Sequence, residues 1–350
     1  MEYRYLGRTG IRVSPLCLGC MMFGGRTPPD EVQQIIDHAI DAGVNFLDNA
    51  NVYATGNAEV VTGEALKRNG HRDHIVLATK CHGNMFKEGT GNPKATALQD
   101  KLNPNRFGNS RRQIIQQCEA SLKRLQTDYI DLYQIHRPHP ECAIDETLRA
   151  LDDLVTAGKV RYLGTSTFAA WQLVEAHWTA EKLALNRFVT EQPPYHPLDR
   201  RIERELIPMA QTFGMALIPW SPLAGGFLSG KYKRNNLGPG DARFGKGSTH
   251  PRRTMLDNDR AFDILETLEA IADAHSRPVS QVALSWCMNQ PGITSPIIGP
   301  RTLNQLTDNL AALDLQLTDD DRRKIDEAAP PGTFVQPFYE AKFGPHPHRV

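Results

Sequence analysis

The sequence predicts an α/β protein, a closed (β/α)8 barrel of the TIM type preceded by a β-hairpin. Eight short apolar segments alternate with amphipathic segments along the 350 residues, and most connections between them are short. Such alternation is typical of a parallel sheet covered by helices, and eight units suit a closed barrel. The alternative is a doubly wound sheet, whose dinucleotide-binding form needs G-x-G-x-x-G after the first strand. Residues 16–25 lack that motif.

The elements are expected in a regular order. The turn Gly7-Arg8-Thr9-Gly10 predicts a hairpin between two short strands. Barrel strands are expected at 15–20, 44–48, 75–80, 129–136, 160–166, 188–192, 215–220 and 295–299. Helices are expected at 28–42, 59–68, 111–125, 144–157, 169–182, 201–213 and 259–275, and several of them end at a glycine.

Two connections, 81–110 and 231–253, are too long to be simple links. They follow the third and seventh strands, where barrels build their ligand sites, so we expect both to border the site. The second contains Gly240 to Gly247, which resembles a phosphate-binding P-loop. Gly247 replaces the required hydroxyl residue and no strand directly precedes the motif, so triphosphate hydrolysis is not expected.

Domain organisation is expected to be simple, with one barrel over 1–330 and a tail over 331–350. The tail carries His346 and His348, but a mobile terminus is favoured over a metal site. No metal is expected elsewhere. Among the six cysteines only Cys17 and Cys20 have a C-x-x-C spacing, and residues three apart on a strand face opposite ways. Reduced thiols are therefore expected.

Charge and hydropathy restrict the partners. Forty basic residues balance forty acidic ones, which disfavours nucleic acid and anionic membranes as partners. The chain has no run of about 18 apolar residues and no signal-like start, so we expect a cytoplasmic protein, as a monomer or homo-oligomer. A small molecule is the expected ligand.

Four ionisable side chains follow neighbouring predicted strands. Asp48 ends the second strand and Tyr53 lies just beyond it, Lys80 ends the third, and His136 ends the fourth. A barrel brings these strand ends to one rim, so the four side chains should converge on a single site. A buried Tyr–Asp pair with only a structural role is the alternative for Asp48 and Tyr53.

The chemistry of this set favours carbonyl reduction. A lysine ammonium lowers the pKa of a neighbouring phenol, and an aspartate holds the lysine. Tyr53 could then donate its proton to a carbonyl oxygen that gains negative charge, while His136 keeps that carbonyl in line. The set contains no nucleophile paired with a base, so hydrolysis is disfavoured.

The second half of the chain contains features suited to a hydride-donating cofactor. Ser166 and Gln192 end the fifth and sixth strands, and Trp220 precedes a turn rich in small residues. Arg301 opens a helix that carries Gln305 and Asn309 on one face. A guanidinium beside a helix N-terminus favours a phosphate dianion, and the 2′-phosphate of NADPH provides one.

The whole pattern resembles the aldo-keto reductase family, from Tyr3 to about Ala328. The matching segments are 18–21, 48–53, 78–80, 131–136, 158–161, 220–226 and 229–232. The form Trp220-Ser221-Pro222-Leu223 and the long seventh loop are most similar to the bacterial branch that includes the potassium-channel β subunits.

The resemblance implies an NADP(H)-dependent oxidoreductase that interconverts a carbonyl and an alcohol. It makes Tyr53 the general acid, Lys80 and Asp48 its tuning pair, and His136 the orienting residue. Ser166 and Gln192 would bind the nicotinamide amide, and Trp220 would stack on the ring. The implied cofactor-binding residues are Gly19, Met21, Asp48, Ser166, Gln192, Trp220, Ser221, Pro222, Leu223, Gly225, Lys231, Arg243, Gly299, Arg301, Gln305 and Asn309.

Three residues depart from the family pattern. Thr167 stands where an asparagine is usual, Asn49 where a threonine is usual, and Asn51 where an aspartate is usual. We expect Thr167 to alter one amide contact and the two asparagines to be tolerated. The alternative function is a cofactor-binding regulatory scaffold, as in channel β subunits. Multiple-turnover oxidation of NADPH by a test aldehyde separates the two.

Overall fold

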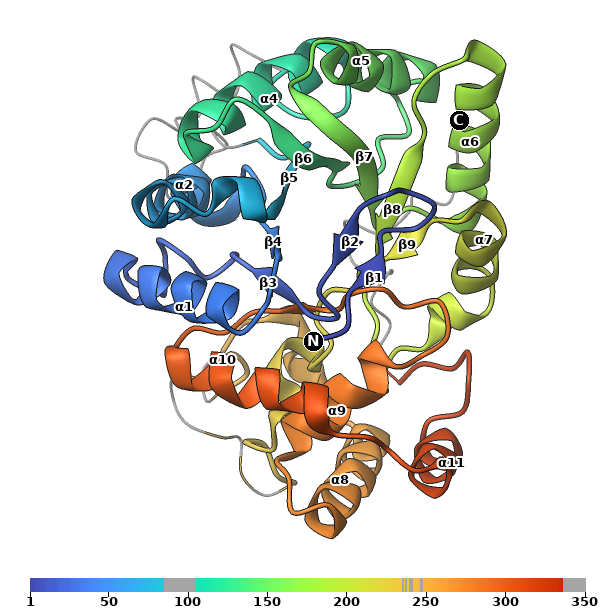
Figure 1. The fold of residues 1–350 in the computed structure, drawn as a ribbon. Coiled ribbons are helices and arrows are strands. Elements are labelled where there is room, and N and C mark those ends of the chain that lie inside the picture. Colours follow the sequence, from blue (N-terminus) through green and yellow to red (C-terminus); the bar gives the residue numbers. More distant parts are fainter. Residues whose placement is uncertain (85–104, 235, 237, 239–241, 246–247, 336–350) are drawn as a thin grey trace.

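The computed structural model describes residues 1–84, 105–234, 236, 238, 242–245 and 248–335 (Figure 1). Its centre is an eight-stranded sheet in the order β10-β3-β4-β5-β6-β7-β8-β9, in which every neighbouring pair is parallel. The strands are β3 (Cys17–Gly19), β4 (Phe46–Asp48), β5 (Val76–Cys81), β6 (Ile130–Ile135), β7 (Val160–Ser166), β8 (Phe188–Gln192), β9 (Ala216–Leu217) and β10 (Ile297–Ile298).

The two edges of this sheet meet and close the barrel. Parallel bridges join Leu217 to Ile293 and Trp220 to Ile297, and the Ile297 amide donates to Pro219 O at 2.7 Å. Closure removes the open strand edges that a doubly wound sheet would leave. The (β/α)8 prediction is therefore confirmed.

The predicted N-terminal hairpin is also present. It pairs β1 (Arg4–Tyr5) with β2 (Arg12–Val13) in antiparallel register. Leu6 and Val13 are fully buried in the same apolar cluster as Phe46 and Leu132. The hairpin thus covers one end of the barrel interior, opposite the end that carries the polar strand termini described below.

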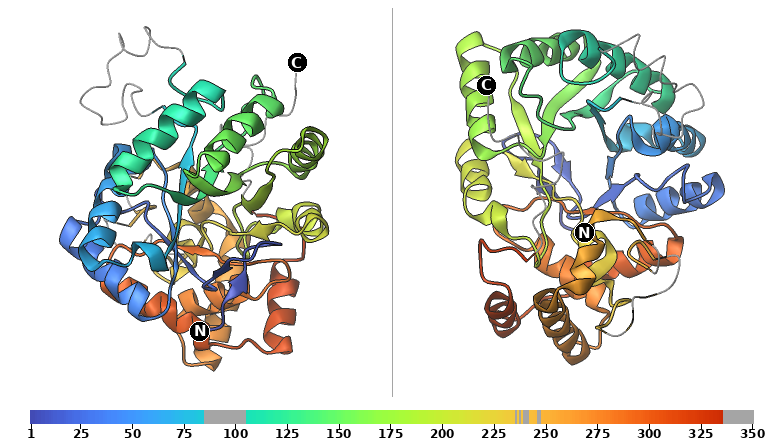
Figure 2. Two further views of the ribbon diagram at one scale, coloured as in Figure 1. Left: turned by 45° about the horizontal axis from the view of Figure 1, so that its top comes forward. Right: turned by 180° about the vertical axis from the view of Figure 1, so that it is seen from behind.

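Helices surround the barrel on its outer face (Figures 1 and 2). A second, larger apolar cluster fills the space between them and the sheet. The helices are α1 (Pro29–Asp41), α2 (Asn57–Asn69), α4 (Arg111–Leu125), α5 (Ile144–Thr156), α6 (Ala170–Leu183), α7 (Leu206–Phe213), α8 (Asp259–Ala274), α9 (Val279–Met288), α10 (Leu303–Leu310) and α11 (Asp319–Ala328).

Local signals explain several boundaries. Ser110 caps α4 by accepting a hydrogen bond from the Gln113 amide, and Asn258 caps α8 in the same way. Gly70 and Gly214 end α2 and α7 with positive φ angles of 72° and 67°. Such angles suit glycine, which has no Cβ to clash with the backbone.

The prediction of one helix over 201–213 is wrong. A 3-10 turn at Arg201–Glu203 precedes α7, which begins only at Leu206. Pro208 supplies the reason, because a continuous helix would place its ring against the carbonyl of residue 204 and lose a hydrogen bond. Restarting the helix at Leu206 puts Pro208 in the first turn, where no such bond is needed.

The sequence patterns did not predict α9 and α11. All ten residues of α9 are buried, so the segment has no polar face and no amphipathic period. By contrast, α11 is strongly polar and opens with three aspartates behind the capping residue Thr318. Each helix lacks the one-sided apolar stripe on which the predictions relied.

Cys17 and Cys20 belong to different parts of the core, as their spacing on a strand predicted. Cys17 packs inside the barrel and Cys20 packs between the sheet and the helices. All six cysteines are free thiols. Within the described residues, no group of three or more His, Cys, Asp or Glu is arranged to hold a metal ion, and no helix is long and apolar enough to cross a membrane.

Candidate active site

Asp48, Lys80 and Tyr53 form a continuous hydrogen-bonded chain at one end of the barrel. Lys80 Nζ donates to Asp48 Oδ2 at 2.6 Å and to Tyr53 Oη at 3.1 Å. A third bond, of 2.7 Å, goes to the backbone oxygen of Asn49. The ammonium therefore has an acceptor for each of its three protons, and the lysine side chain is fully buried.

Two amides hold the other oxygen of Asp48. Gln192 Nε2 donates to Asp48 Oδ1 at 2.9 Å, and Gln134 Nε2 donates at 3.1 Å. Register explains part of this arrangement, because Lys80 on β5 pairs with Gln134 on β6. The Asp48 carboxyl group is therefore buried yet hydrogen-bonded on both oxygens. Sequence reasoning missed Gln134, although it lies two residues before His136.

Tyr53 opens a turn of unusual backbone geometry. Ala54, Thr55 and Gly56 have positive φ angles of 45°, 54° and 93°. Positive φ is unfavourable for alanine and threonine, so this left-handed stretch stores strain next to Tyr53. The turn places the Tyr53 ring with its centroid 4.9 Å from Lys80 Nζ and 5.9 Å from the centroid of the His136 ring.

The electrostatics of Tyr53 correct one expectation. Burial raises the pKa of Tyr53, and the neighbouring Lys80 ammonium lowers it by less, so the pKa lies above its ordinary value. Lys80 does lower the pKa of Tyr53, as the sequence predicted, but the larger effect of burial was not anticipated. Burial also disfavours the charged form of Lys80, but Asp48 and Tyr53 outweigh it and the lysine pKa is raised. The resting state is thus a protonated phenol beside an ammonium.

His136 is neutral in this environment. Burial lowers its pKa well below the ordinary value, and the nearby Arg137 and Lys80 lower it further. Its amide nitrogen donates to Cys81 O at 2.8 Å, which fixes the strand end that carries the ring. A neutral imidazole can donate one hydrogen bond to a carbonyl oxygen and carries no charge that competes with Lys80.

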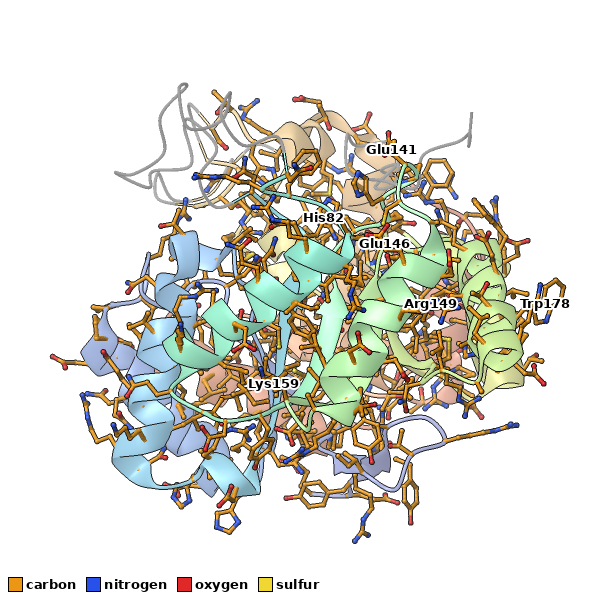
Figure 3. The ribbon with its side chains drawn as sticks, turned by 90° about the horizontal axis from the view of Figure 1, so that it is seen from above. His82, Glu141, Glu146, Arg149, Lys159 and Trp178 are labelled. Carbon is orange, nitrogen blue, oxygen red and sulfur yellow. The ribbon has the colours of Figure 1, made fainter. Side chains whose placement is uncertain are left out.

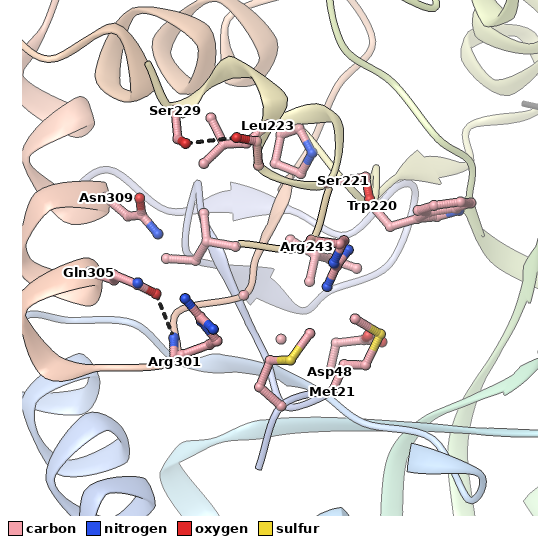
Figure 4. Close-up of a pocket in the computed structure, with 18 of the residues that line it drawn as sticks. Met21, Asp48, Trp220, Ser221, Leu223, Ser229, Arg243, Arg301, Gln305 and Asn309 are labelled. Atoms are coloured by element: carbon pink, nitrogen blue, oxygen red, sulfur yellow. Dashed lines mark hydrogen bonds between the residues drawn. The ribbon is translucent and has the colours of Figure 1, made fainter. Parts of the chain in front are cut away.

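A cavity of about 650 Å³ extends from these side chains across the barrel rim (Figure 4). Asp48, Tyr53 and His136 line it, whereas Lys80 lies behind them and reaches it through Tyr53. The structure brings all of the predicted cofactor-binding residues to its wall. These are Gly19, Met21, Asp48, Ser166, Gln192, Trp220, Ser221, Pro222, Leu223, Gly225, Lys231, Arg243, Gly299, Arg301, Gln305 and Asn309.

The wall also contains residues that sequence reasoning did not assign to the cofactor. Arg26 and Met22 come from the loop after β3, and Ser280 and Asp308 come from α9 and α10. Gly226, Ser229, Ile297 and Ile298 complete this group, and Arg137 joins it at the end of β6. Arg26 follows Gly24-Gly25 in the loop after the first barrel strand. Its position after a barrel strand is the feature of the sequence that could have assigned it to the cavity.

The cavity wall is rich in positive charge. Its described basic residues are Arg26, Arg137, Lys231, Arg243 and Arg301, against the two acids Asp48 and Asp308. Burial lowers the pKa of Arg243, and the like charges of Arg26 and Arg301 lower it further. Guanidinium groups close enough to oppose each other's charge favour a polyanionic ligand between them.

The turn after Trp220 suits close approach of such a ligand. Gly225 and Gly226 have φ angles of 71° and 100°, within the short helical turn Ala224–Ser229. Glycine at these angles leaves the backbone without side chains over the cavity. Figure 4 shows Arg301, Gln305 and Asn309 on one side of the cavity and Asp48 and Trp220 on the other.

Arg301 lies just before α10. Its amide donates to Gln305 Oε1 at 2.9 Å, and Thr302 caps the helix through the Gln305 amide at 3.3 Å. Arg301 and the start of α10 thus form one compact unit, in the order that the sequence predicted. Asn309, which also lines the cavity, is buried one turn further along the helix.

The three residues that depart from the expected family pattern, Thr167, Asn49 and Asn51, all make defined side-chain contacts. Thr167 has φ of 60°, a conformation that asparagine adopts more readily than a β-branched residue. Its hydroxyl donates to Ser166 O and accepts from Arg137. Asn49 donates to Ala58 O and Thr62 Oγ1, and Asn51 donates to Gln117 Oε1. Asn49 also accepts from the Ala50 amide and is therefore satisfied at both ends of its side chain, whereas Asn51 Oδ1 is buried without a hydrogen-bond partner.

Several predictions lie outside the described residues. They concern the greater part of the 81–110 connection, parts of 231–253 including half of the P-loop-like segment 240–247, and the tail that carries His346 and His348. The described portion of the seventh-strand loop does bring Lys231 and Arg243 to the cavity.

Comparison with known proteins agrees with this geometry. Residues 15–330 match the model of the Aldo/keto reductase family. The chain belongs to the aldo/keto reductase family. It is 39% identical to the "Uncharacterized oxidoreductase YrpG" of Bacillus subtilis (strain 168), over 94% of this chain and 96% of that one. The predicted resemblance is confirmed.

Other relatives of this aldo/keto reductase bear two kinds of name. A "Probable voltage-gated potassium channel subunit beta" of Oryza sativa subsp. japonica is 37% identical, over 90% of this chain and 92% of its own. The "Versiconal hemiacetal acetate reductase" of Aspergillus parasiticus is 34% identical, over 93% and 96%. The family is thus one of oxidoreductases that also includes channel subunits.

Proposed function

We propose that this aldo/keto reductase reduces an aldehyde or ketone to an alcohol with NADPH, reversibly, and that Tyr53 is its general acid and base. The observation that carries the proposal is the chain Asp48–Lys80–Tyr53, which ends in a phenol on the wall of the cavity. A bound reduced nicotinamide supplies the hydride. The protein must therefore deliver a proton and stabilise negative charge at the carbonyl oxygen.

Tyr53 delivers that proton from its hydroxyl group. As the phenol loses the proton, the ammonium of Lys80 at 3.1 Å stabilises the phenolate that forms. Asp48 keeps Lys80 charged, because its 2.6 Å bond offsets the cost of burying the ammonium. In the reverse direction the phenolate accepts the proton of the alcohol, so the same three residues act in both directions.

His136 orients the carbonyl group. Its ring lies edge-on to Tyr53, and the imidazole is neutral because its pKa is lowered. A neutral ring donates a hydrogen bond to the same oxygen that receives the Tyr53 proton, but it does not transfer a proton itself. This division makes Tyr53 the acid and His136 the positioning donor.

The cavity wall fits NADP(H). Its basic residues suit the phosphate groups, with Lys231 beside Gly226 of the glycine turn, Arg301 just before α10, and Arg243 close to Arg301 and Arg26. Ser166, Gln192 and Trp220 share the wall with Tyr53 and suit the nicotinamide, and Gln305 and Asn309 suit the adenosine portion. We assign the 2′-phosphate to Arg301, which makes NADPH the preferred cofactor over NADH.

A second candidate function follows from the names of the relatives. The rice relative is named a potassium-channel β subunit, which supports a cofactor-binding scaffold with little turnover. The experiment is to follow nicotinamide absorbance with NADPH, the purified protein and a panel of aldehydes, ketones and alcohols. Oxidation of many equivalents of NADPH per protein supports the reductase. Tight NADPH binding without turnover on any compound would favour the scaffold.

A further inference from the structure

Arg137 is a cation at the catalytic end of the cavity. It directly follows His136 at the end of β6 and lines the cavity together with Tyr53. One of its terminal nitrogens donates to His136 O at 2.8 Å, to Thr167 Oγ1 at 3.2 Å and to Ser166 Oγ at 3.4 Å. These contacts hold the guanidinium across the ends of β6 and β7.

Among the described residues around Tyr53, the acidic groups are ion-paired or have a pKa shifted towards the neutral form. Asp48 is ion-paired with Lys80, and burial raises the pKa of Glu191 to about 8, so that this carboxyl is mostly protonated at neutral pH. His136 and His82 are neutral because burial lowers the pKa of each, to about 4 for His82. Arg137 is thus a cation that lines the cavity wall beside Tyr53 and His136.

The phosphate groups of the cofactor do not account for this charge. The other basic residues of the wall are Arg26, Lys231, Arg243 and Arg301, and they come from the loop after β3, the loop after β9 and the start of α10. Arg26 and Arg301 both influence the pKa of Arg243, so those three lie close together. Arg137 instead influences Tyr53 and His136, where the carbonyl group reacts.

We propose that Arg137 selects carbonyl substrates that carry an anionic group, a carboxylate or a phosphate, close to the reacting carbonyl. The inference rests on the proposed function and names its substrate class. A guanidinium forms charge-assisted hydrogen bonds with both groups, and its planar fork fits either of them. A positively charged cavity end also attracts an anionic substrate during its approach.

A structural role for Arg137 predicts a different result. If the guanidinium only tied β6 to β7, its removal would impair reduction of charged and neutral carbonyls alike. An effect on the acidity of Tyr53 would also act on both. The decisive quantity is therefore the ratio of kcat/KM between an anionic aldehyde and its uncharged counterpart, since effects common to both cancel.

The test uses the full-length protein with saturating NADPH and two matched pairs of aldehydes. Succinic semialdehyde is compared with butanal for the carboxylate, and glyceraldehyde 3-phosphate with glyceraldehyde for the phosphate. The variants are Arg137→Gln, which removes the charge, and Arg137→Lys, which keeps it. Arg149→Gln removes an exposed arginine of α5 on the outside of the barrel and serves as the matched control (Figure 3).

The wild type and Arg149→Gln are expected to favour the anionic member of at least one pair by about 10-fold or more in kcat/KM. Arg137→Gln should lower that ratio about 10- to 100-fold, as loss of a charge-assisted hydrogen bond implies. Arg137→Lys should keep part of it. The preference should also weaken as ionic strength rises. The pair that responds identifies carboxylate or phosphate.

An equal preference in the wild type and Arg137→Gln would overturn the inference while leaving the reductase proposal intact. Absence of turnover with every compound would instead remove the reductase proposal. In that case anion binding tests the role of Arg137 directly. Nicotinamide fluorescence measures the affinity of the NADPH-loaded protein for succinate and for inorganic phosphate. Unchanged affinity for both anions in Arg137→Gln would then reject it.

Discussion

The ammonium of Lys80 lies 2.6 Å from Oδ2 of Asp48, and both side chains are removed from solvent. Two neighbouring strands, β4 and β5, supply these residues. Burying either charge alone would cost stability, and the ion pair offsets that cost for both residues. The same ammonium group donates a hydrogen bond to the Tyr53 hydroxyl. One ion pair therefore contributes to the stability of the barrel rim and to the proposed proton transfer.

Breaking this pair should destabilise the protein. Lys80→Met leaves a buried carboxylate without its ammonium, and Asp48→Asn leaves a buried ammonium without its carboxylate. Each should lower the free energy of unfolding by about 3–5 kcal/mol, measured by urea denaturation. The double variant should cost less than the sum of the two because no single charge is left buried. Strict additivity would show that the pair does not interact energetically.

Replacing Tyr53 with phenylalanine should remove the proton donor and leave the ring in place. We expect kcat for an unactivated ketone to fall about 10²- to 10⁴-fold, the usual contribution of a positioned acid. Affinity for NADPH should change little, because the hydroxyl accepts its hydrogen bond from Lys80, which is not one of the proposed cofactor-binding residues. Steady-state kinetics and NADPH titration measure the two effects. A Tyr53→Phe variant with normal turnover would require another proton donor.

Arg301 should distinguish NADPH from NADH. Charge-assisted hydrogen bonds are worth about 1.5–3 kcal/mol, so Arg301→Ala should weaken NADPH binding roughly 10- to 150-fold. NADH lacks the 2′-phosphate and should bind with nearly unchanged affinity. Titration of both cofactors by tryptophan fluorescence tests the difference, with Arg277→Ala, an exposed arginine outside the cavity wall, as control. Equal losses for the two cofactors would place the phosphate elsewhere.

Glu191 should make stability fall as pH rises. Burial raises its pKa from 4.5 to about 8, and its carboxyl accepts a hydrogen bond from the Phe168 amide. Between these two pH values the unfolded chain has lost this proton and the folded chain retains it, so its contribution to stability decreases with pH. The pKa of Glu191 differs by about 3.5 between the unfolded and the folded chain, from 4.5 to about 8. The free energy of unfolding should therefore decrease by at most about 5 kcal/mol over this pH range.

The comparison variant is Glu191→Gln, which cannot ionise. The difference in unfolding free energy between the variant and the wild type should shift in favour of the variant from pH 5 to pH 8.5, as measured by urea denaturation at a series of pH values. Glu64→Gln, an exposed change on α2, should show no such trend. A constant difference across this range would mean that Glu191 is ionised throughout.

Much of the barrel and of its site followed from local pattern. The strands β7 and β8 and the helix α4 begin and end where the sequence predicted, because apolar periodicity, caps and glycines act over a few residues. Asp48, Lys80 and His136 could be placed together because successive parallel strands bring their ends to one rim. No distance between strands was needed for that inference.

Other features depend on residues far apart in the chain. Gln134 and Gln192 reach Asp48 only through the strand register, and Arg26 joins Arg243 at the cavity only after the barrel closes. The raised pKa of Tyr53 is the clearest case. The sequence correctly predicted that Lys80 lowers this pKa, but the larger, opposite effect comes from burial. Desolvation sums over the whole tertiary environment, so the spacing of two residues along the chain cannot determine its size.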